Sequence, residues 1–254
     1  MKLSQEREAQ QMQILTVAVI KGGTGKTTAV GAIGSCLGAL GKRTLCVDCD
    51  ADLQNLDIVM GTVNYLLPAV PDSSDLPEDI SDLCLEHPDL ENVWLLPPLS
   101  FSAGGLDGSY DSLFSAVRKQ FDFCLLDAPA GIGDDVRNLL SYADEAIIVT
   151  TGDRSSLRDG QTICSLLQET GMTDIRLLVN RVDPRAFRRE RATVDDVIDA
   201  VGARLLGIIR DDRNVSEASN REIPLVLYSR KTASQGFLRV ARRLTGECIP
   251  VSGA

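Results

Sequence analysis

The 254-residue sequence contains a single histidine, few aromatic residues and no long uninterrupted apolar run. The histidine, His87, lies in a segment rich in proline and aspartate, where we expect an exposed side chain. One histidine placed in this way does not predict Ser-His or Cys-His chemistry. No apolar run approaches the ~20 residues of a membrane-spanning helix, and residues 1–11 are too polar for a signal peptide. We therefore expect a cytoplasmic protein.

Basic residues are also fewer than acidic ones. The sequence has 26 lysines and arginines and 36 aspartates and glutamates, which give a formal net charge of -10. An acidic chain has no general electrostatic attraction to nucleic acid or to anionic lipid. Two short basic segments, 185–191 and 239–243, run against this balance, and we interpret both as solvated charge. Nucleic acid is therefore not an expected partner.

The seven cysteines are odd in number and show no framework spacing, which is typical of reduced thiols in a cytoplasm. Cys46 and Cys49 have C-x-x-C spacing, but the sequence offers no second pair to complete a metal site. We do not expect zinc binding or redox chemistry from them.

Apolar strands alternate with helices along most of the chain, without a run of hairpins, which predicts an α/β fold. Specifically, we expect a single doubly wound, mostly parallel sheet with helices on both faces. The prolines of segment 67–108 indicate a surface excursion. Predicted domains are a polar extension (1–12), one α/β domain (13–247) and a short tail (248–254). The expected strands are 14–20, 44–48, 92–96, 121–126, 145–150, 175–180 and 205–209, and the expected helices are 29–40, 78–85, 110–120, 134–142, 155–170, 193–201, 214–220 and 233–244.

Residues 21–28, Lys-Gly-Gly-Thr-Gly-Lys-Thr-Thr, form a glycine-rich turn between the first strand and the first helix. Glycines allow a tight turn whose N–H groups surround one anion, and the helix N-terminus adds free donors. Lys26 would reach the β- and γ-phosphates of a nucleotide, and the Thr27 hydroxyl would hold Mg²⁺. The strict pattern requires glycine at Ile20, so a chance glycine turn before a core helix is the alternative.

Aspartates follow two further strands, at Asp48 and Asp50 and at Asp127. Ligands of open α/β sheets bind outside the carboxyl ends of the strands. Asp127 would bind Mg²⁺ through water beside Thr27. Asp48 suits a supporting role at Mg²⁺ and Asp50 suits orienting the attacking water, although all three aspartates could instead cap turns or loops.

Asn180 ends a later apolar strand and is followed by Arg181. A side-chain amide at this edge can read the donor and acceptor edge of a purine, and an asparagine in a turn is the alternative interpretation. We include both residues among the predicted nucleotide contacts.

Residues 21–28 resemble the deviant Walker A motif of the MinD/ParA family of P-loop ATPases, in which the residue before the first lysine need not be glycine. Ile20 therefore fits the family pattern. Other matching segments make the resemblance closest to the MinD branch, and together they span roughly 13–247. These segments are 48–50 (Asp-Cys-Asp), 55–61 (Asn-Leu-Asp-Ile-Val-Met-Gly), 127–132 (Asp-Ala-Pro-Ala-Gly-Ile), 157–159 (Leu-Arg-Asp) and 217–220 (Glu-Ala-Ser-Asn).

The resemblance implies an ATPase that binds Mg-ATP and forms an ATP-dependent homodimer with nucleotide between the subunits. Lys21 would reach the phosphates bound by the partner subunit, Asp50 would position water, and hydrolysis would dissolve the dimer. Asn55, Asp57 and Asp159 would face the dimer or a partner protein. The implied site comprises catalytic residues Lys21, Lys26 and Asp50, cofactor-binding residues Gly22, Gly23, Thr24, Gly25, Lys26, Thr27, Thr28, Asn180 and Arg181, and metal-binding residues Thr27, Asp48 and Asp127.

The implied role is placement of the division septum, with a division-inhibitor or positioning protein as partner. A ParA-type ATPase that positions plasmid, chromosome or flagellar cargo is the alternative. An electron-transfer relative like nitrogenase iron protein would need a cysteine within 128–133, where there is none. A scaffold that binds nucleotide without hydrolysing it is disfavoured by Lys26, Thr27 and Asp50.

Three departures from the family pattern bear on these expectations. The tail 245–254 has a proline and no basic face, so it does not predict the basic amphipathic helix with which MinD proteins bind membrane. We expect any membrane association to be peripheral and through a partner. Arg210 replaces the family proline beside the base, and Gln54 replaces a basic residue that faces partners.

Overall fold

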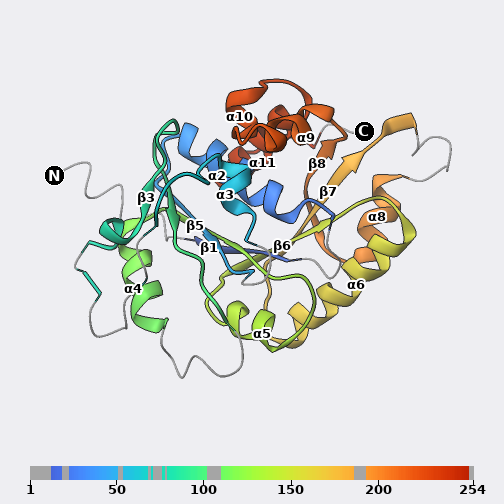
Figure 1. Ribbon diagram of the computed structural model, residues 1–254. Coiled ribbons are helices and arrows are strands. Elements are labelled where there is room, and N and C mark those ends of the chain that lie inside the picture. Colours follow the sequence, from blue (N-terminus) through green and yellow to red (C-terminus); the bar gives the residue numbers. More distant parts are fainter. Residues whose placement is uncertain are drawn as a thin grey trace.

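The computed structural model describes residues 13–18, 23–50, 54–67, 70, 76–77, 79–101, 110–185 and 193–251. Their centre is an eight-stranded sheet, drawn nearly edge-on in Figure 1. All neighbouring strands run parallel except the first pair, β3 and β4. In sheet order the strands are β3 (Leu85–Glu86), β4 (Val93–Leu96), β2 (Thr44–Asp48), β5 (Phe123–Asp127), β1 (Gln13–Ala18), β6 (Glu145–Thr150), β7 (Ile175–Val182) and β8 (Arg204–Arg210).

Helices cover both faces of this sheet, as expected for parallel strands that bury both sides (Figure 1). The upper layer in the figure contains α2 (Lys26–Ala39), α3 (Leu56–Met60), α9 (Arg213–Asn220), α10 (Leu225–Tyr228) and α11 (Thr232–Leu244). The lower layer contains α4 (Asp111–Gln120), α5 (Asp134–Leu140), α6 (Arg154–Glu169) and α8 (Val194–Val201), and the 3-10 helix η2 (Ile80–Leu83) contacts α4.

Alternate residues of the strands fill the two cores. Cys46 and Leu125 pack with the upper helices, whereas their neighbours Leu45 and Leu126 pack with the lower ones. This alternation follows from the period of two along a strand. The sheet is therefore packed on both faces, and the loops that follow its strands start from buried, hydrogen-bonded residues.

The predicted fold class and the order of the predicted elements are confirmed, with most boundaries within two residues. Helix α2 starts at Lys26, three residues earlier than predicted, so the end of the glycine-rich turn forms its first turn. Three short elements were not predicted: α3, α10 and the two-residue strand β3, which pairs antiparallel with β4. Predicted strand residues 19–20 lie outside the described residues.

The prediction for His87 is wrong, because only 4% of this residue is exposed. Its Nδ1 accepts the backbone N–H of Asp89 (3.1 Å), so its Nε2 carries the proton and donates to the Met60 carbonyl (2.7 Å). Burial lowers the pKa of His87. The ring thus connects the segment before β4 to the end of α3, a contact that a loop composition cannot reveal.

The interpretation of segment 239–243 as solvated charge is also wrong for one residue. The Arg243 guanidinium donates to the carbonyl oxygens of Leu206, Ile249 and Pro250 (2.8–2.9 Å), and burial lowers its pKa. These hydrogen bonds therefore connect the last described residues to β8 and α11.

Within the described ranges, no helix is long and apolar enough to cross a bilayer.

Candidate nucleotide-binding site

The carboxyl ends of β2, β5 and β1 lie side by side in the middle of the sheet, and the predicted phosphate-binding residues follow them. Two cavities open there and share Gly25, Thr28, Arg181 and Ser219. The smaller one, of about 350 Å³, contains Lys26, Thr27 and Asp50. The larger one, of about 750 Å³, extends toward β7, β8 and α9. The structure thus unites motifs that lie more than a hundred residues apart in sequence.

The glycine-rich turn has the backbone geometry that its composition predicts. Gly23 (φ +90°) and Gly25 (φ +94°) both adopt left-handed conformations, which glycine tolerates without strain. Gly25 is the N-cap of α2, so the first N–H groups of that helix are available to an anion. A Cβ atom at Gly25 would lie 2.4 Å from the Asn180 amide nitrogen. Lys21 and Gly22, which belong to the predicted site, fall outside the described residues.

Lys26, which lines the smaller cavity, forms a buried ion pair with Asp127. The Lys26 ammonium donates to Asp127 Oδ1 at 2.5 Å, and the two side chains are 8% and 1% exposed. Burial raises the pKa of Asp127 to about 6, against the opposing effects of Lys26 and of a hydrogen bond from Thr27. The Lys26 ammonium, the Thr27 hydroxyl and the Asp127 carboxylate therefore meet at one point, and binding of phosphate and metal there stays a prediction.

Asp48 and Asp50 take different positions, as expected for residues on either side of a strand end. Asp48 is buried, and its carboxylate accepts three backbone N–H groups, those of Asp50 (3.0 Å), Asn55 (3.1 Å) and Leu56 (3.1 Å). Burial raises the pKa of Asp48, although these bonds and Lys26 oppose the shift. Asp50 lines the smaller cavity with Lys26 and Thr27. Its distance from bound phosphates stays a prediction.

The end of β7 holds the glycine-rich turn from the other side. Asn180 Nδ2 donates to the Thr24 carbonyl (2.8 Å), and Arg181 Nη1 donates to the Gly23 carbonyl (3.0 Å). Arg181 has a left-handed backbone (φ +54°), which is uncommon for a residue other than glycine. The base-reading role of Asn180 stays a prediction, and the contact observed for its amide supports the glycine-rich turn.

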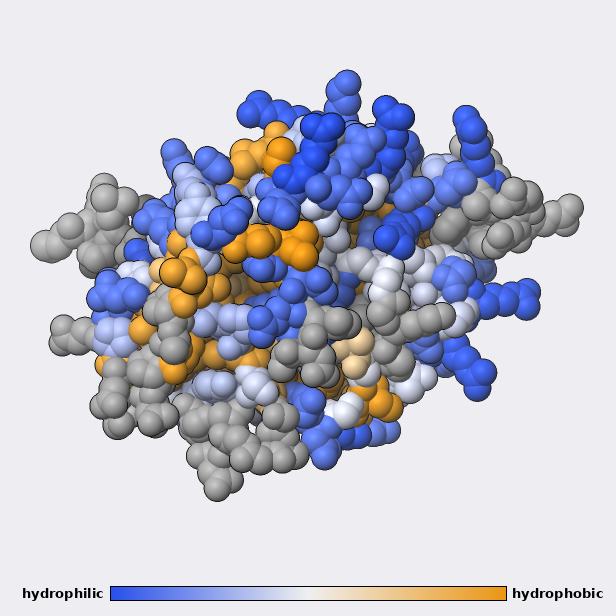
Figure 2. All heavy atoms as spheres, in the orientation of Figure 1, coloured by the Kyte–Doolittle hydropathy of each residue, from blue (hydrophilic) through white to orange (hydrophobic). Residues whose placement is uncertain are grey.

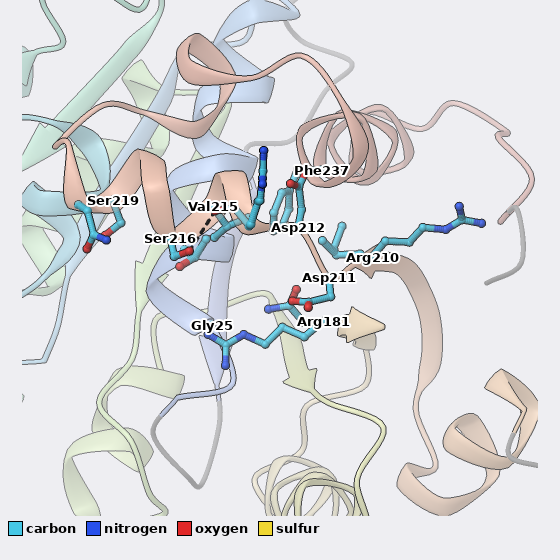
Figure 3. A pocket seen from close by; sticks show the side chains of 14 residues that line it. Gly25, Arg181, Arg210, Asp211, Asp212, Val215, Ser216, Ser219 and Phe237 are labelled. Atoms are coloured by element: carbon cyan, nitrogen blue, oxygen red, sulfur yellow. Dashed lines mark hydrogen bonds between the residues drawn. The ribbon is translucent and has the colours of Figure 1, made fainter. Parts of the chain in front are cut away.

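The larger cavity suits a nucleoside. Its floor includes the apolar side chains of Ile209, Val215 and Phe237, and its rim is polar (Figure 3). In this view Arg181 extends toward Gly25, whereas Arg210 points away from the cavity. The arginine that replaces the family proline therefore leaves the cavity open.

Sequence reasoning missed several residues of this cavity, and the signal for one of them was present. Asp212 is the N-cap of α9, because its Oδ1 accepts the N–H of Asn214 (3.0 Å), and its Oδ2 accepts the N–H of Ala233 (3.1 Å). An aspartate directly before a helix is a recognised N-cap signal. The link to α11 carries no such signal. Further lining residues are Asp211, Arg213, Ser216, Ser219 and Asn220.

The residues present fit a magnesium nucleotide. A hydroxyl beside a carboxylate, with room for water, is a donor set that Mg²⁺ prefers. Thr24 Oγ1 is buried in the phosphate loop without a hydrogen-bond partner among the described residues, as expected where a ligand completes the site. The described ranges contain no cluster of three His, Cys, Asp or Glu side chains suited to a metal. Cys46 and Cys49 are buried thiols whose pKa values are raised by burial.

Comparisons with known proteins agree with this geometry. Residues 15–225 match the family described as the CobQ/CobB/MinD/ParA nucleotide binding domain. The septum site-determining protein MinD of Bacillus subtilis is 34% identical over 242 residues, which cover 91% of this chain and 88% of that protein.

Solved structures give the same result in three dimensions. MinD in the MinC:MinD cell division complex of Aquifex aeolicus superimposes with a TM-score of 0.81 at 31% identity, covering 94% of this chain and 98% of that one. MinD of Pyrococcus horikoshii, solved with Mg-ADP, gives a TM-score of 0.74 at 26% identity, covering 92% and 96%. The chain belongs to the CobQ/CobB/MinD/ParA family of nucleotide-binding proteins, and its resemblance within that family is to MinD.

Proposed function

We propose that the protein is a MinD-like ATPase, an ATP-dependent homodimer switch that regulates placement of the division septum. The observation that carries the proposal is the convergence of Lys26, Thr27 and Asp50 in one cavity at the central strand ends. The similarity to MinD proteins over about nine-tenths of the chain supports the cellular role.

Each residue of the site makes a separate contribution to phosphoryl transfer. Lys26 binds the β- and γ-phosphates, for which it exchanges its contact with Asp127. Thr27 and Asp127 would hold Mg²⁺, which supplies charge neutralisation at the phosphates when bound. Asp50 orients the attacking water. Asn180 and Arg181 keep the loop carbonyls turned away from the anion, so that its N–H groups face it.

The dimer supplies the remaining charge. Lys21 of the partner subunit would approach the transferring phosphoryl group and stabilise the charge that spreads over it, as an arginine finger does in other ATPases. Hydrolysis removes the γ-phosphate, which both subunits would contact, so the dimer dissociates. A switch of this kind converts nucleotide state into oligomeric state.

The partner we propose is a division inhibitor. The Aquifex aeolicus relative was solved as a MinC:MinD complex, and the matching chain covers 94% of this one. Asn55, Asp57 and Asp159 are the proposed contact residues for the dimer or for this partner. The protein would act in the cytoplasm and reach the membrane through a partner.

The test compares wild type with Lys21→Ala. The variant should bind fluorescent ADP like wild type, because Lys21 acts on the other subunit's nucleotide, but it should lose ATP-dependent dimerisation in light scattering. Phosphate release should fall by about 100-fold or more, the size of effect seen when such a charge is removed. Normal dimerisation of Lys21→Ala with ATP would refute the role in the partner's site, and absence of nucleotide binding by wild type would refute the ATPase itself.

A further inference from the structure

The Asp48 carboxylate is engaged by the protein backbone from three directions. Only 5% of the residue is exposed, and its two oxygens accept the N–H groups of Asp50, Asn55 and Leu56 at 3.0–3.1 Å. These donors come from both ends of the segment 50–56, which connects β2 to α3. One buried side chain therefore joins Asp50 to the first residues of α3.

Asp48 itself is part of the hydrogen-bonded sheet. Asp48 is the last residue of β2, and it lies in register with Asp127 on the neighbouring strand β5. The Cys49 N–H donates to the Asp127 carbonyl (3.0 Å), so the pairing continues one residue beyond the strand. The carboxylate is thus presented from the rigid part of the sheet, next to the buried ion pair.

The same carboxylate caps α3. The first N–H groups of a helix lack partners within the helix, and a side-chain oxygen of the N-cap residue usually satisfies one of them. Asn55 is the N-cap of α3, and its side chain makes no capping hydrogen bond. Oδ2 of Asp48 instead accepts the N–H groups of Asn55 and Leu56. The start of α3 is therefore fixed by a residue of the sheet.

The far end of α3 is fixed as well. His87 Nε2 donates to the Met60 carbonyl, and Gly61, which has φ +67°, lies so close to Glu222 that a Cβ atom there would be 2.4 Å from its carbonyl oxygen. With both ends of the helix held, the Asp48 carboxylate links Asp50 to a helix of fixed position. Asp50 is the first residue after this anchor that lines the smaller cavity.

We infer that Asp48 is a positioning residue, which sets the distance of Asp50 from the phosphates by holding Asp50 against the start of α3, and that it is not a contact of the metal. The inference rests on the proposed ATPase function. A carboxylate that accepts three N–H groups has most of its negative charge satisfied locally, whereas Thr27 and Asp127 already bond to each other beside Lys26. Catalysis needs the water-orienting group in place to within a fraction of an ångström, so a loosened loop affects turnover before affinity.

The experiment compares wild type with Asp48→Ala and Asp48→Asn, and with Asp79→Asn as a matched control. Asp79 also accepts a backbone N–H, that of Ser81 (2.9 Å), but it is exposed and caps the 3-10 helix η2, and it lines neither cavity. Four quantities are measured: hydrogen exchange of a peptide spanning 49–60 without nucleotide, fluorescent ADP affinity, Mn²⁺ affinity of the ADP complex, and the rate of ATP hydrolysis.

We expect exchange in the 49–60 peptide to accelerate at least about 10-fold in Asp48→Ala, while the kcat for ATP falls about 100-fold and ADP affinity changes little. Asp48→Asn keeps one acceptor oxygen and should restore part of the protection and of the kcat. The affinity for Mn²⁺ should stay within about 3-fold, because loss of a residue that supports a metal ligand costs about 10–100-fold. Asp79→Asn should match wild type in all four measurements.

Two results would overturn the inference. A loss of Mn²⁺ affinity of the larger size would assign Asp48 to the metal, and wild-type exchange in Asp48→Ala would show that it does not hold the loop. Failure of wild type to bind nucleotide would refute the proposed function instead, since the exchange measurement on the nucleotide-free protein still tests the anchor by itself.

Discussion

Two buried acidic residues, one at the carboxyl end and one at the amino end of the strands, each form an ion pair with a basic side chain. Asp127 pairs with Lys26 at the carboxyl edge, and Glu145, at the start of β6, lies 2.8 Å from Arg176 Nε at the amino edge. Burial outweighs the attraction of the partner in both cases, because it raises the pKa of Asp127 to about 6 and that of Glu145 to about 7. Each native carboxyl group therefore holds its proton to a higher pH than it would in the unfolded chain.

The pH dependence of stability follows from these shifts. Since the native state binds the extra proton, Asp127 stabilises the fold below about pH 4, and this contribution is lost as the pH rises through about 6. In wild type, the free energy of unfolding should fall between pH 4 and 6 by up to about 3 kcal/mol because of Asp127. In Asp127→Asn this part of the fall should be absent. Denaturant titrations at several pH values measure it.

Glu145→Gln is the matched control for this measurement, because its window lies between about pH 4.5 and 7. The two variants should therefore flatten different parts of the stability profile. Parallel profiles for wild type and Asp127→Asn would show that Asp127 titrates normally in the folded protein.

The residues of the site were largely predictable, whereas their direct contacts were not. Lys26, Thr27 and Asp127 converge as their motifs predict, because parallel strands bring their carboxyl ends to one edge. The three N–H bonds to Asp48 and the burial of His87 had no signal in residue spacing. Both depend on how a short helix folds back over the strand ends, which local sequence does not encode.

Helix α2 is the element on which the phosphate loop rests, and its packing depends on small residues. It is buried almost continuously from Ala29 to Gly38. A Cβ atom at Gly38 would lie 2.3 Å from Val93 Cγ2 and 2.6 Å from the Glu91 carbonyl oxygen. The helix therefore approaches β4 and the turn before it more closely than any larger side chain permits.

Gly38→Ala tests this close approach. Overpacking against a backbone oxygen typically costs about 1–3 kcal/mol, and the better helix propensity of alanine returns about 1 kcal/mol. We expect a net loss of up to about 2 kcal/mol in the free energy of unfolding, measured by urea titration. Ser165→Ala on the exposed face of α6 is a control without overpacking, which gains helix propensity and loses the hydrogen bond from Ser165 Oγ to the Gln161 carbonyl (3.1 Å). Stabilisation by Gly38→Ala would mean that α2 has room to shift.

Elements of ordinary length were predictable from periodicity, and the short ones were not. Helices α3 and α10 have five and four residues, too few for a periodic pattern to stand out. Strand β3 has two residues and exists only through its antiparallel partner β4. Such elements are stabilised by tertiary contacts, so they appear only once the sheet is formed.

At the scale of the whole molecule, charge separates the proposed function from its alternative. The chain carries a formal net charge of -10. In the face seen in Figure 2, hydrophilic residues dominate the top and right of the described surface, and apolar residues gather toward the left and centre. An ATPase that positions cargo on DNA needs a basic surface, whose lysines and arginines neutralise DNA phosphates and release their counterions. The acidic charge balance of this chain therefore disfavours DNA binding.

We therefore expect no DNA retention by the ATP-bound protein. In a gel-shift assay with random duplex DNA at about 100 mM salt, wild type with ATP should leave the DNA free, with the same mixture at about 20 mM salt as the permissive control. ATP-dependent retardation that weakens steeply with salt would favour the ParA-type alternative.

The hydrogen bonds from Asn180 and Arg181 to the carbonyls of Thr24 and Gly23 also bear on how fast a nucleotide is captured. Ordering a flexible loop costs about 1–2 kcal/mol of conformational entropy per residue. Here the second half of the loop is ordered during folding, by a strand on the other side of the cavity. Association then involves a preorganised receptor, and its rate is governed by diffusion and by exchange of the Lys26 contact, with little contribution from loop closure.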